Sequence, residues 1–138
     1  MVISYEINIK NMKQEDKDLL LKDLCARLPY GVKIKTSYNK MDEPIELRFV
    51  NPRNESFAIG SNFTLISGLD FDTYECKPYL FPLSSMTEEQ KKEEYEICKY
   101  YLNGYESKLI DFYNKNHLDY RGLIPKGLAI DATNLNIY

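Results

Sequence analysis

The chain has 138 residues, of which 43% are apolar and 28% are charged, and its 18 basic and 21 acidic side chains give a net charge of −3. This length and mixture are typical of one soluble globular domain and exclude a disordered chain, a collagen-like chain and a disulfide-rich miniprotein. Because the sequence has neither an apolar run of membrane-spanning length nor a basic cluster, we expect neither a membrane nor duplex DNA as a partner.

The first two elements follow from hydrophobic periodicity. Residues 2–9 alternate between apolar and polar, which predicts a half-buried strand, and residues 13–28 follow a helical period. The buried stripe of this helix is predicted to comprise Leu20, Leu21, Leu24, Cys25 and Leu28, and its charged residues are predicted to be exposed: Lys13, Glu15, Asp16, Lys17 and Lys22. Pro29 and Gly31 should end it.

The middle of the chain predicts an antiparallel meander of four to five short strands. The strands are expected over residues 32–36, 45–50, 56–59, 62–66 and 73–80. In the second of them Ile45, Leu47 and Phe49 alternate toward one face, and Gly60 marks a tight turn or bulge. Pro78 cannot donate a ladder hydrogen bond, so the last strand is predicted to lie at a sheet edge.

Two to three helices are expected in the C-terminal part. Residues 87–103 begin with the capping-box sequence Thr87-Glu88-Glu89-Gln90, and the predicted buried stripe is Tyr95, Cys98, Tyr101 and Leu102. A second helix is predicted over 105–116, and residues 118–131 should form a short helix or a packed loop. Strands and helices are segregated along the chain, so the predicted class is α+β, with one domain over 1–138.

The three cysteines, Cys25, Cys76 and Cys98, are far apart in the sequence. No Cys/His spacing of a zinc site is present, and Asp70 and Asp72 lack the further ligands of a calcium loop. We therefore expect reduced thiols in a cytoplasmic protein, with no metal and no cofactor.

The segment from Tyr113 to Gly122 concentrates chemically useful side chains. It contains the single histidine, His117, together with Asp119 and Arg121. A histidine beside a carboxylate can act as a general base, and an arginine can clamp a phosphate or carboxylate. The alternative is structural, with His117 near a helix end, Asp119 in a turn and Tyr120 packed inward.

Tyrosine is about threefold over-represented, at 12 residues, beside 6 Phe and no Trp. Four tyrosines fall on predicted apolar faces: Tyr5, Tyr95, Tyr101 and Tyr113. Five others have no predicted core role: Tyr30, Tyr79, Tyr100, Tyr105 and Tyr120. Exposed tyrosine is a favoured contact residue, since it buries a large area at low entropy cost.

Three blocks carry a family resemblance. They are LLLKDLCARLPYGV at 19–32, KPYLFPLSSMTEE at 77–89, and NKNHLDYRGLI at 114–124 followed by KGLA at 126–129. Together they resemble a set of short uncharacterised proteins from gut Bacteroidales genomes, their phages and mobile elements. The resemblance implies a phage or mobile-element accessory gene and no particular reaction. Within these blocks the predicted ligand-binding residues are Tyr30, Tyr79, His117, Asp119, Tyr120 and Arg121.

The leading hypothesis from the sequence is a non-enzymatic binding protein, with no catalytic residue assigned. It would sequester a nucleotide-like small ligand or block a host protein, and by analogy with small accessory proteins its role would be counter-defence. One alternative is a single-stranded nucleic-acid-binding module. Another is a small hydrolase or nuclease that uses His117, Asp119 and Arg121. A homo-oligomer is compatible with the sequence.

Overall fold

The computed structural model describes residues 12–40, 43–60, 64–100 and 104–138. The chain forms two compact units, an N-terminal unit up to Pro78 and a C-terminal unit from Tyr79 onward. The described residues form α-helices and a mixed sheet, so the α+β class is confirmed. That the whole chain is a single domain stays a prediction. The predicted strand over 2–9, with Tyr5, lies outside the described residues. No helix among the described residues is long and apolar enough to cross a membrane.

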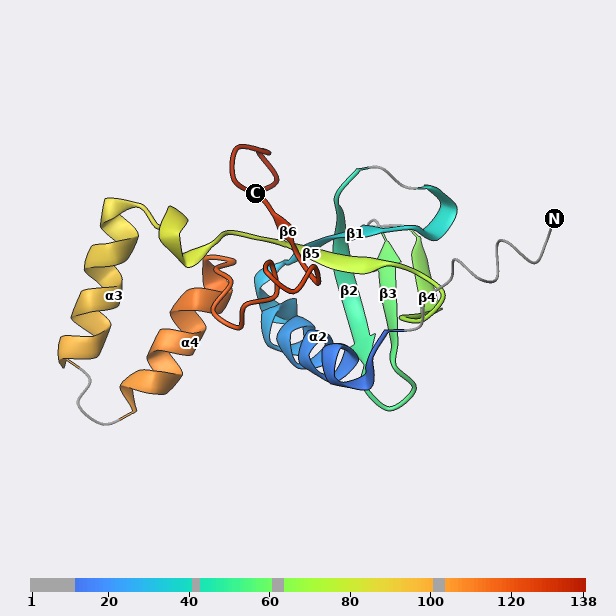
Figure 1. Cartoon of the computed structure of the whole chain (residues 1–138), viewed down its shortest axis with the longest axis horizontal. Coiled ribbons are helices and arrows are strands. Elements are labelled where there is room, and N and C mark those ends of the chain that lie inside the picture. The colour runs from blue at the N-terminus through green and yellow to red at the C-terminus, as the bar shows by residue number, and fades with distance from the viewer. Residues whose placement is uncertain (1–11, 41–42, 61–63, 101–103) are drawn as a thin grey trace. The chain divides into compact units, whose positions relative to one another are not determined.

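Helix α2 (Gln14–Arg27) confirms the first predicted helix and packs against the sheet strand β2 (Ile45–Asn51) (Figure 1). A 3₁₀ turn over Leu28–Tyr30 follows, and Gly31 ends it with a φ of +69°. This left-handed conformation is inexpensive only for glycine, which is why the helix ends there.

The predicted buried stripe of α2 was wrong in part. Cys25 is exposed, and three charged residues are buried instead: Lys17, Asp23 and Arg27. The Lys17 Nζ lies 2.9 Å from an Asp72 carboxylate oxygen and 3.6 Å from one of Glu55. The hydrogen bond to Asp72 raises the pKa of Lys17. Partner carboxylates on distant turns, which helical periodicity does not reveal, therefore allow this lysine to be buried.

The meander is confirmed in outline. Hydrogen-bonded neighbours follow the order β4-β3-β2-β1-β5, all antiparallel, with β1 at Lys33–Thr36, β3 at Ser56–Gly60, β4 at Leu65–Asp70 and β5 at Cys76–Leu80. β4 begins and ends later than predicted. A Cβ atom at Gly60 would clash with the Thr64 carbonyl oxygen, so this position needs glycine.

The prediction that the Pro78 strand lies at a sheet edge was wrong. The first three residues of β5 pair with β1, ending at Ile34 opposite Pro78. The next two, Tyr79 and Leu80, pair in parallel with a short strand β6 (Ile130–Asp131) that periodicity did not reveal. The proline thus stands where the strand changes partners, from β1 to β6.

A bulge breaks the predicted alternation in β2. The register shifts between Leu47 and Phe49, opposite Ile59 and Ala58. Leu47 and Val50 are consequently buried, whereas Phe49 is 55% exposed rather than on the inward face. One extra residue reverses the facing of every later side chain on a strand, and a single sequence does not show where it is inserted.

The capping box predicted at Thr87 is confirmed. The Thr87 Oγ1 accepts from the Gln90 backbone N–H at 3.1 Å, and the Gln90 Oε1 accepts from the Thr87 N–H at 3.0 Å. The helix that follows, α3 (Glu88–Tyr100), packs against α4 (Tyr105–Lys115) (Figure 1).

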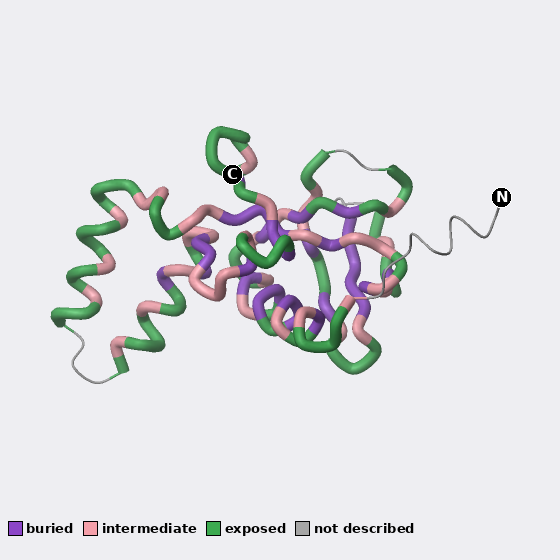
Figure 2. Tube along the Cα trace, viewed as in Figure 1, coloured by how far each residue is buried: buried purple, intermediate pink, exposed green. Residues whose placement is uncertain are grey.

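The predicted buried stripe of α3 was wrong. Tyr95 and Cys98 are exposed, no described residue of α3 is buried (Figure 2), and Tyr101 and Leu102 lie outside the described residues. Toward α4 the helix makes polar contacts: the Tyr113 hydroxyl donates to Glu94 at 2.6 Å, and Gln90 donates to Asn116 at 3.3 Å. The described residues of α3 are therefore half-buried or exposed, and none belongs to the core.

Residues 118–129 form a packed loop, one of the two predicted outcomes, and the strand β6 follows it. Leu118, Leu123, Leu128 and Ala129 are buried along it. At the start of this loop, Leu118 pairs in parallel with Phe81. The Phe81 N–H donates to the His117 carbonyl and the Asp119 N–H donates to the Phe81 carbonyl, both at 2.8 Å. This pairing fixes the backbone of the segment that carries most of the predicted site.

Candidate functional site

Five of the six predicted ligand-binding residues lie in the C-terminal unit. Tyr79 is buried at the end of β5, and His117, Asp119, Tyr120 and Arg121 follow α4. Tyr30 belongs to the N-terminal unit, where it is exposed on the 3₁₀ turn. The candidate site therefore consists of residues of the C-terminal unit.

His117 ends α4 in a conformation that usually selects glycine. Its φ is +56°, its N–H donates to the Asn114 carbonyl at 3.2 Å, and the Leu118 N–H donates to the Tyr113 carbonyl at 2.9 Å. This pair of bonds is the Schellman motif, with histidine in place of the usual glycine. A residue that carries a Cβ atom is strained by about 1–2 kcal/mol in the left-handed region, because the Cβ atom lies too close to the following carbonyl oxygen.

An aromatic slot surrounds the side chain of Tyr138. The Tyr138 ring stacks on the His117 imidazole, with centroids 3.7 Å apart and an interplanar angle of 10°, and the Phe81 ring lies tilted at 6.1 Å. The Tyr138 hydroxyl donates to the Tyr79 carbonyl oxygen at 2.9 Å. We define the aromatic slot as the His117 ring, the Phe81 ring and the Tyr79 carbonyl.

Asp119 is buried and caps the loop that follows. One of its carboxylate oxygens accepts from the Leu123 N–H at 2.8 Å, and the other accepts from the Ile124 N–H at 2.9 Å. Both oxygens thus bind backbone donors of the loop, which corresponds to the structural alternative considered from the sequence.

Replacing Asp119 with Ala is expected to lower the free energy of unfolding by about 2 kcal/mol, because two backbone N–H groups lose charged acceptors. Asp119→Asn, which keeps one good acceptor, should lie between that variant and the wild type. Urea unfolding followed by circular dichroism measures the difference. Asp131→Ala, which removes an exposed acceptor of the Thr133 N–H, is the matched control. An unchanged stability in Asp119→Ala would contradict the capping role.

Tyr120 and Arg121 belong to a three-layer stack. The Tyr120 ring stacks on Tyr113 with centroids 5.3 Å apart, and the Arg121 guanidinium carbon lies 4.7 Å from the Tyr120 ring centroid. The Tyr120 hydroxyl donates to the buried Asn114 side chain at 3.0 Å, which fixes the ring. Burial and the hydrogen bond to Glu94 raise the pKa of Tyr113, so its phenol stays neutral.

The two acidic residues considered for a cation have other partners. The Thr73 hydroxyl and the backbone N–H groups of Asp72 and Thr73 donate to Asp70, and the hydroxyl bond lowers the pKa of Asp70. Asp72 binds Lys17. In the described part of the chain, no group of three or more His, Cys, Asp or Glu residues is placed to hold a metal ion.

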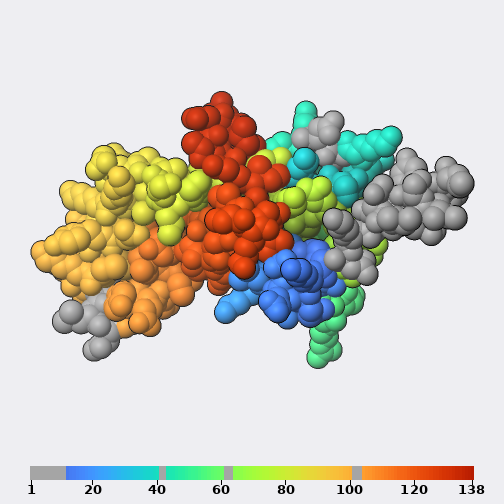
Figure 3. Space-filling view, in the orientation of Figure 1, coloured from blue at the N-terminus to red at the C-terminus, as the bar shows by residue number. Residues whose placement is uncertain are grey.

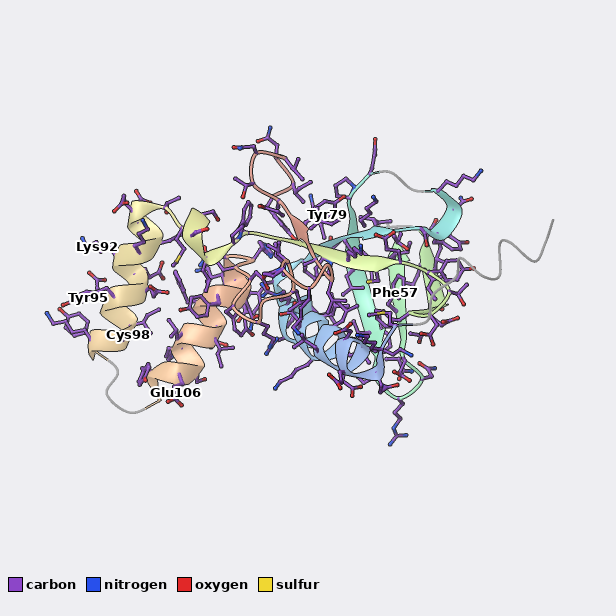
Figure 4. The ribbon with its side chains drawn as sticks, in the orientation of Figure 1. Phe57, Tyr79, Lys92, Tyr95, Cys98 and Glu106 are labelled. Atoms are coloured by element: carbon purple, nitrogen blue, oxygen red, sulfur yellow. The ribbon has the colours of Figure 1, made fainter. Side chains whose placement is uncertain are left out.

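Sequence reasoning missed the residues that complete the slot. Tyr138 and Phe81 carry no periodic signal, and Tyr138 lies outside the three resembling blocks. It also missed the exposed face of α3, where Lys99 Nζ lies 5.9 Å from the Tyr95 ring centroid and 5.6 Å from that of Tyr100. In Figure 4 the Tyr95 side chain points away from α4. The exposure of Tyr30 and Tyr100 agrees with their lack of a predicted core role, whereas Tyr79 is buried.

No family model, no curated protein and no solved structure matches the chain.

Proposed function

We propose that the chain is an accessory protein of a phage or mobile element that acts in the cytoplasm by binding, without catalysis, and that it blocks a host protein through the exposed face of α3. The observation that carries this proposal is the exposure of Tyr95 and Tyr100, at 65% and 69%. Tyrosine is among the residues that dominate protein interfaces, because its ring buries much area with few rotatable bonds.

The surroundings of the two tyrosines favour an interface. Lys99 lies near both rings, and such cation–π contacts favour particular ring orientations before a partner arrives. Around them the exposed residues of α3 are charged and of both signs: Glu88, Glu89, Glu93, Glu96, Lys91 and Lys92. An aromatic centre with a charged rim is the common composition of a protein-binding patch. The three sequence blocks described above support the accessory setting.

In the experiment, the full chain is immobilised in three forms, and each is incubated with lysate of a Bacteroidales host. The three forms are the wild type, Tyr95→Ala/Tyr100→Ala, and Phe49→Ala. The Phe49 variant removes an exposed aromatic ring from the N-terminal unit and serves as control. We expect a host protein that the wild type and the control retain and the double variant loses. With that protein purified, the double variant should raise Kd by about 30-fold or more. Equal retention by all three forms would contradict the proposal.

A second candidate is sequestration of a nucleotide-like small ligand, which the stack of Tyr113, Tyr120 and Arg121 favours. An ordered arginine beside an aromatic ring offers a guanidinium for phosphate and a face for a base. A panel of cyclic and linear nucleotides, tested by thermal shift on the wild type and on Arg121→Ala, measures this. We expect at least one nucleotide to raise the melting temperature of the wild type and not that of Arg121→Ala. If no nucleotide stabilises the wild type, this candidate function is excluded.

A further inference from the structure

We propose that Tyr138 occupies a binding site for a planar aromatic ring that carries a hydrogen-bond donor, and that a ligand of this class binds by displacing it. The site is the aromatic slot: a face on His117, a flank on Phe81 and an acceptor on the Tyr79 carbonyl. The inference goes beyond the docking of a host protein on α3 and does not depend on it.

The slot has the contacts that a small aromatic ligand needs. A parallel stack at 3.7 Å contacts one whole face of the ring, and a 2.9 Å hydrogen bond fixes its rotation within that plane. An apolar or aromatic wall with one placed polar group is the usual composition of a small-molecule site. A phenol or a nucleobase with an exocyclic amino group meets both requirements.

The backbone at His117 supports a specific use of the imidazole. At the left-handed position that ends α4, glycine would avoid the strain of a φ of +56°. Histidine accepts that strain and places its ring in the slot, against the face of Tyr138. Strained positions persist where the surrounding structure holds them, as the bond from the Phe81 N–H to the His117 carbonyl does here.

The segment that carries Tyr138 is suited to exchange with a ligand. Residues 133–136 are exposed, and Tyr138 itself is 44% exposed. Figure 3 shows this last part of the chain, in red, at the surface. Its bends are built from local bonds, Thr133 to Asp131 and the Leu135 N–H to the Ala132 carbonyl. A segment that buries little apolar area opens at a low free energy, so displacement leaves the rest of the fold in place.

The experiment uses the single histidine of the chain as a site-specific reporter. The imidazole protons of His117 are followed by NMR in the wild type and in Tyr138→Ala, during titration with p-cresol, which is the tyrosine side chain as a free molecule. In Tyr138→Ala the ring-current shift of these protons should be lost and then restored saturably by p-cresol. The wild type should need about tenfold more p-cresol, because Tyr138 competes for the slot.

Two matched probes test the chemistry of the ligand. 4-Methylanisole has the same ring without a donor and should bind Tyr138→Ala about tenfold more weakly than p-cresol. Adenosine tests the nucleobase source: restoration by adenosine as well as p-cresol assigns a nucleobase ligand, and restoration by p-cresol alone assigns a phenol. Equal binding of p-cresol and 4-methylanisole would contradict the role of the Tyr79 carbonyl.

Further variants keep the test decisive. Phe49→Ala removes an exposed aromatic ring from the N-terminal unit and should leave the His117 signals and the p-cresol response as in the wild type. Should Tyr138→Ala unfold, Tyr138→Phe keeps the stack and loses the hydroxyl bond, and p-cresol should then bind several-fold more readily than to the wild type. The proposal is overturned if p-cresol moves the His117 signals of the folded variant and the wild type alike, or moves neither.

Discussion

Replacing Asp23 with Ala is expected to lower the free energy of unfolding by about 3–5 kcal/mol, one of the two largest effects in this chain. Asp23 and Arg27 are both fully buried, one turn apart on α2, and the Arg27 Nε lies 2.8 Å from an Asp23 carboxylate oxygen. Removing the carboxylate leaves the positive charge of Arg27 in a buried place without this counter-charge, and that desolvation penalty dominates the change.

The matched control is Asp18→Ala on the same helix. Asp18 is exposed and accepts a hydrogen bond from Gln14 at 2.8 Å, so its loss should cost about 0.5 kcal/mol or less. Urea unfolding curves for the two variants give the comparison. Replacing the pair together, as Asp23→Leu/Arg27→Met, should recover much of the stability, because neither charge of the pair then remains in the core. Equal losses for Asp23→Ala and Asp18→Ala would contradict a buried ion pair.

Replacing Phe57 with Ala is expected to lower the free energy of unfolding by about 3–5 kcal/mol. Phe57, the second residue of β3, is buried (Figure 4), and its ring lies 4.9 Å from that of Phe71. Every residue of β3 is buried, so the neighbouring side chains have little freedom to fill the cavity that the truncation leaves.

Phe49→Ala is the control for this prediction, since it makes the same truncation at an exposed position on β2. It should cost less than about 1 kcal/mol. The midpoint of thermal unfolding and the urea midpoint should both rank the variants in this order. A larger loss for Phe49→Ala than for Phe57→Ala would mean that the bulge in β2 is misplaced, because the register shift is what puts Phe49 outside.

Features that depend on a few neighbouring residues were predictable. The capping box needs only Thr87 and Gln90, three residues apart, and both of its hydrogen bonds are present. The end of α2 depends on Pro29 and Gly31, and the need for glycine at Gly60 comes from the Thr64 carbonyl oxygen, only four residues along the chain. Local steric and hydrogen-bonding rules act within one turn of backbone, so a single sequence contains them.

Predictions of which face is buried failed where a partner element decides the matter. On α3, Tyr95 and Cys98 were predicted to be buried because they are apolar and suitably spaced, yet both are exposed. On α2, Lys17 is buried because carboxylates of Glu55 and Asp72 reach it. Helical spacing determines which residues share a face, and the fold alone determines what that face meets.

In the candidate site, too, some features follow from local sequence and others depend on tertiary contacts. The sequence by itself determined the α+β class, the meander, the capped helix and the chemically rich segment around His117, because these follow from local periodicity and residue type. Only the tertiary structure decided that Asp119 binds two backbone N–H groups and that Tyr138 stacks on His117. Such contacts join residues through the folded path of the chain, and no spacing rule links position 138 to positions 79 and 117.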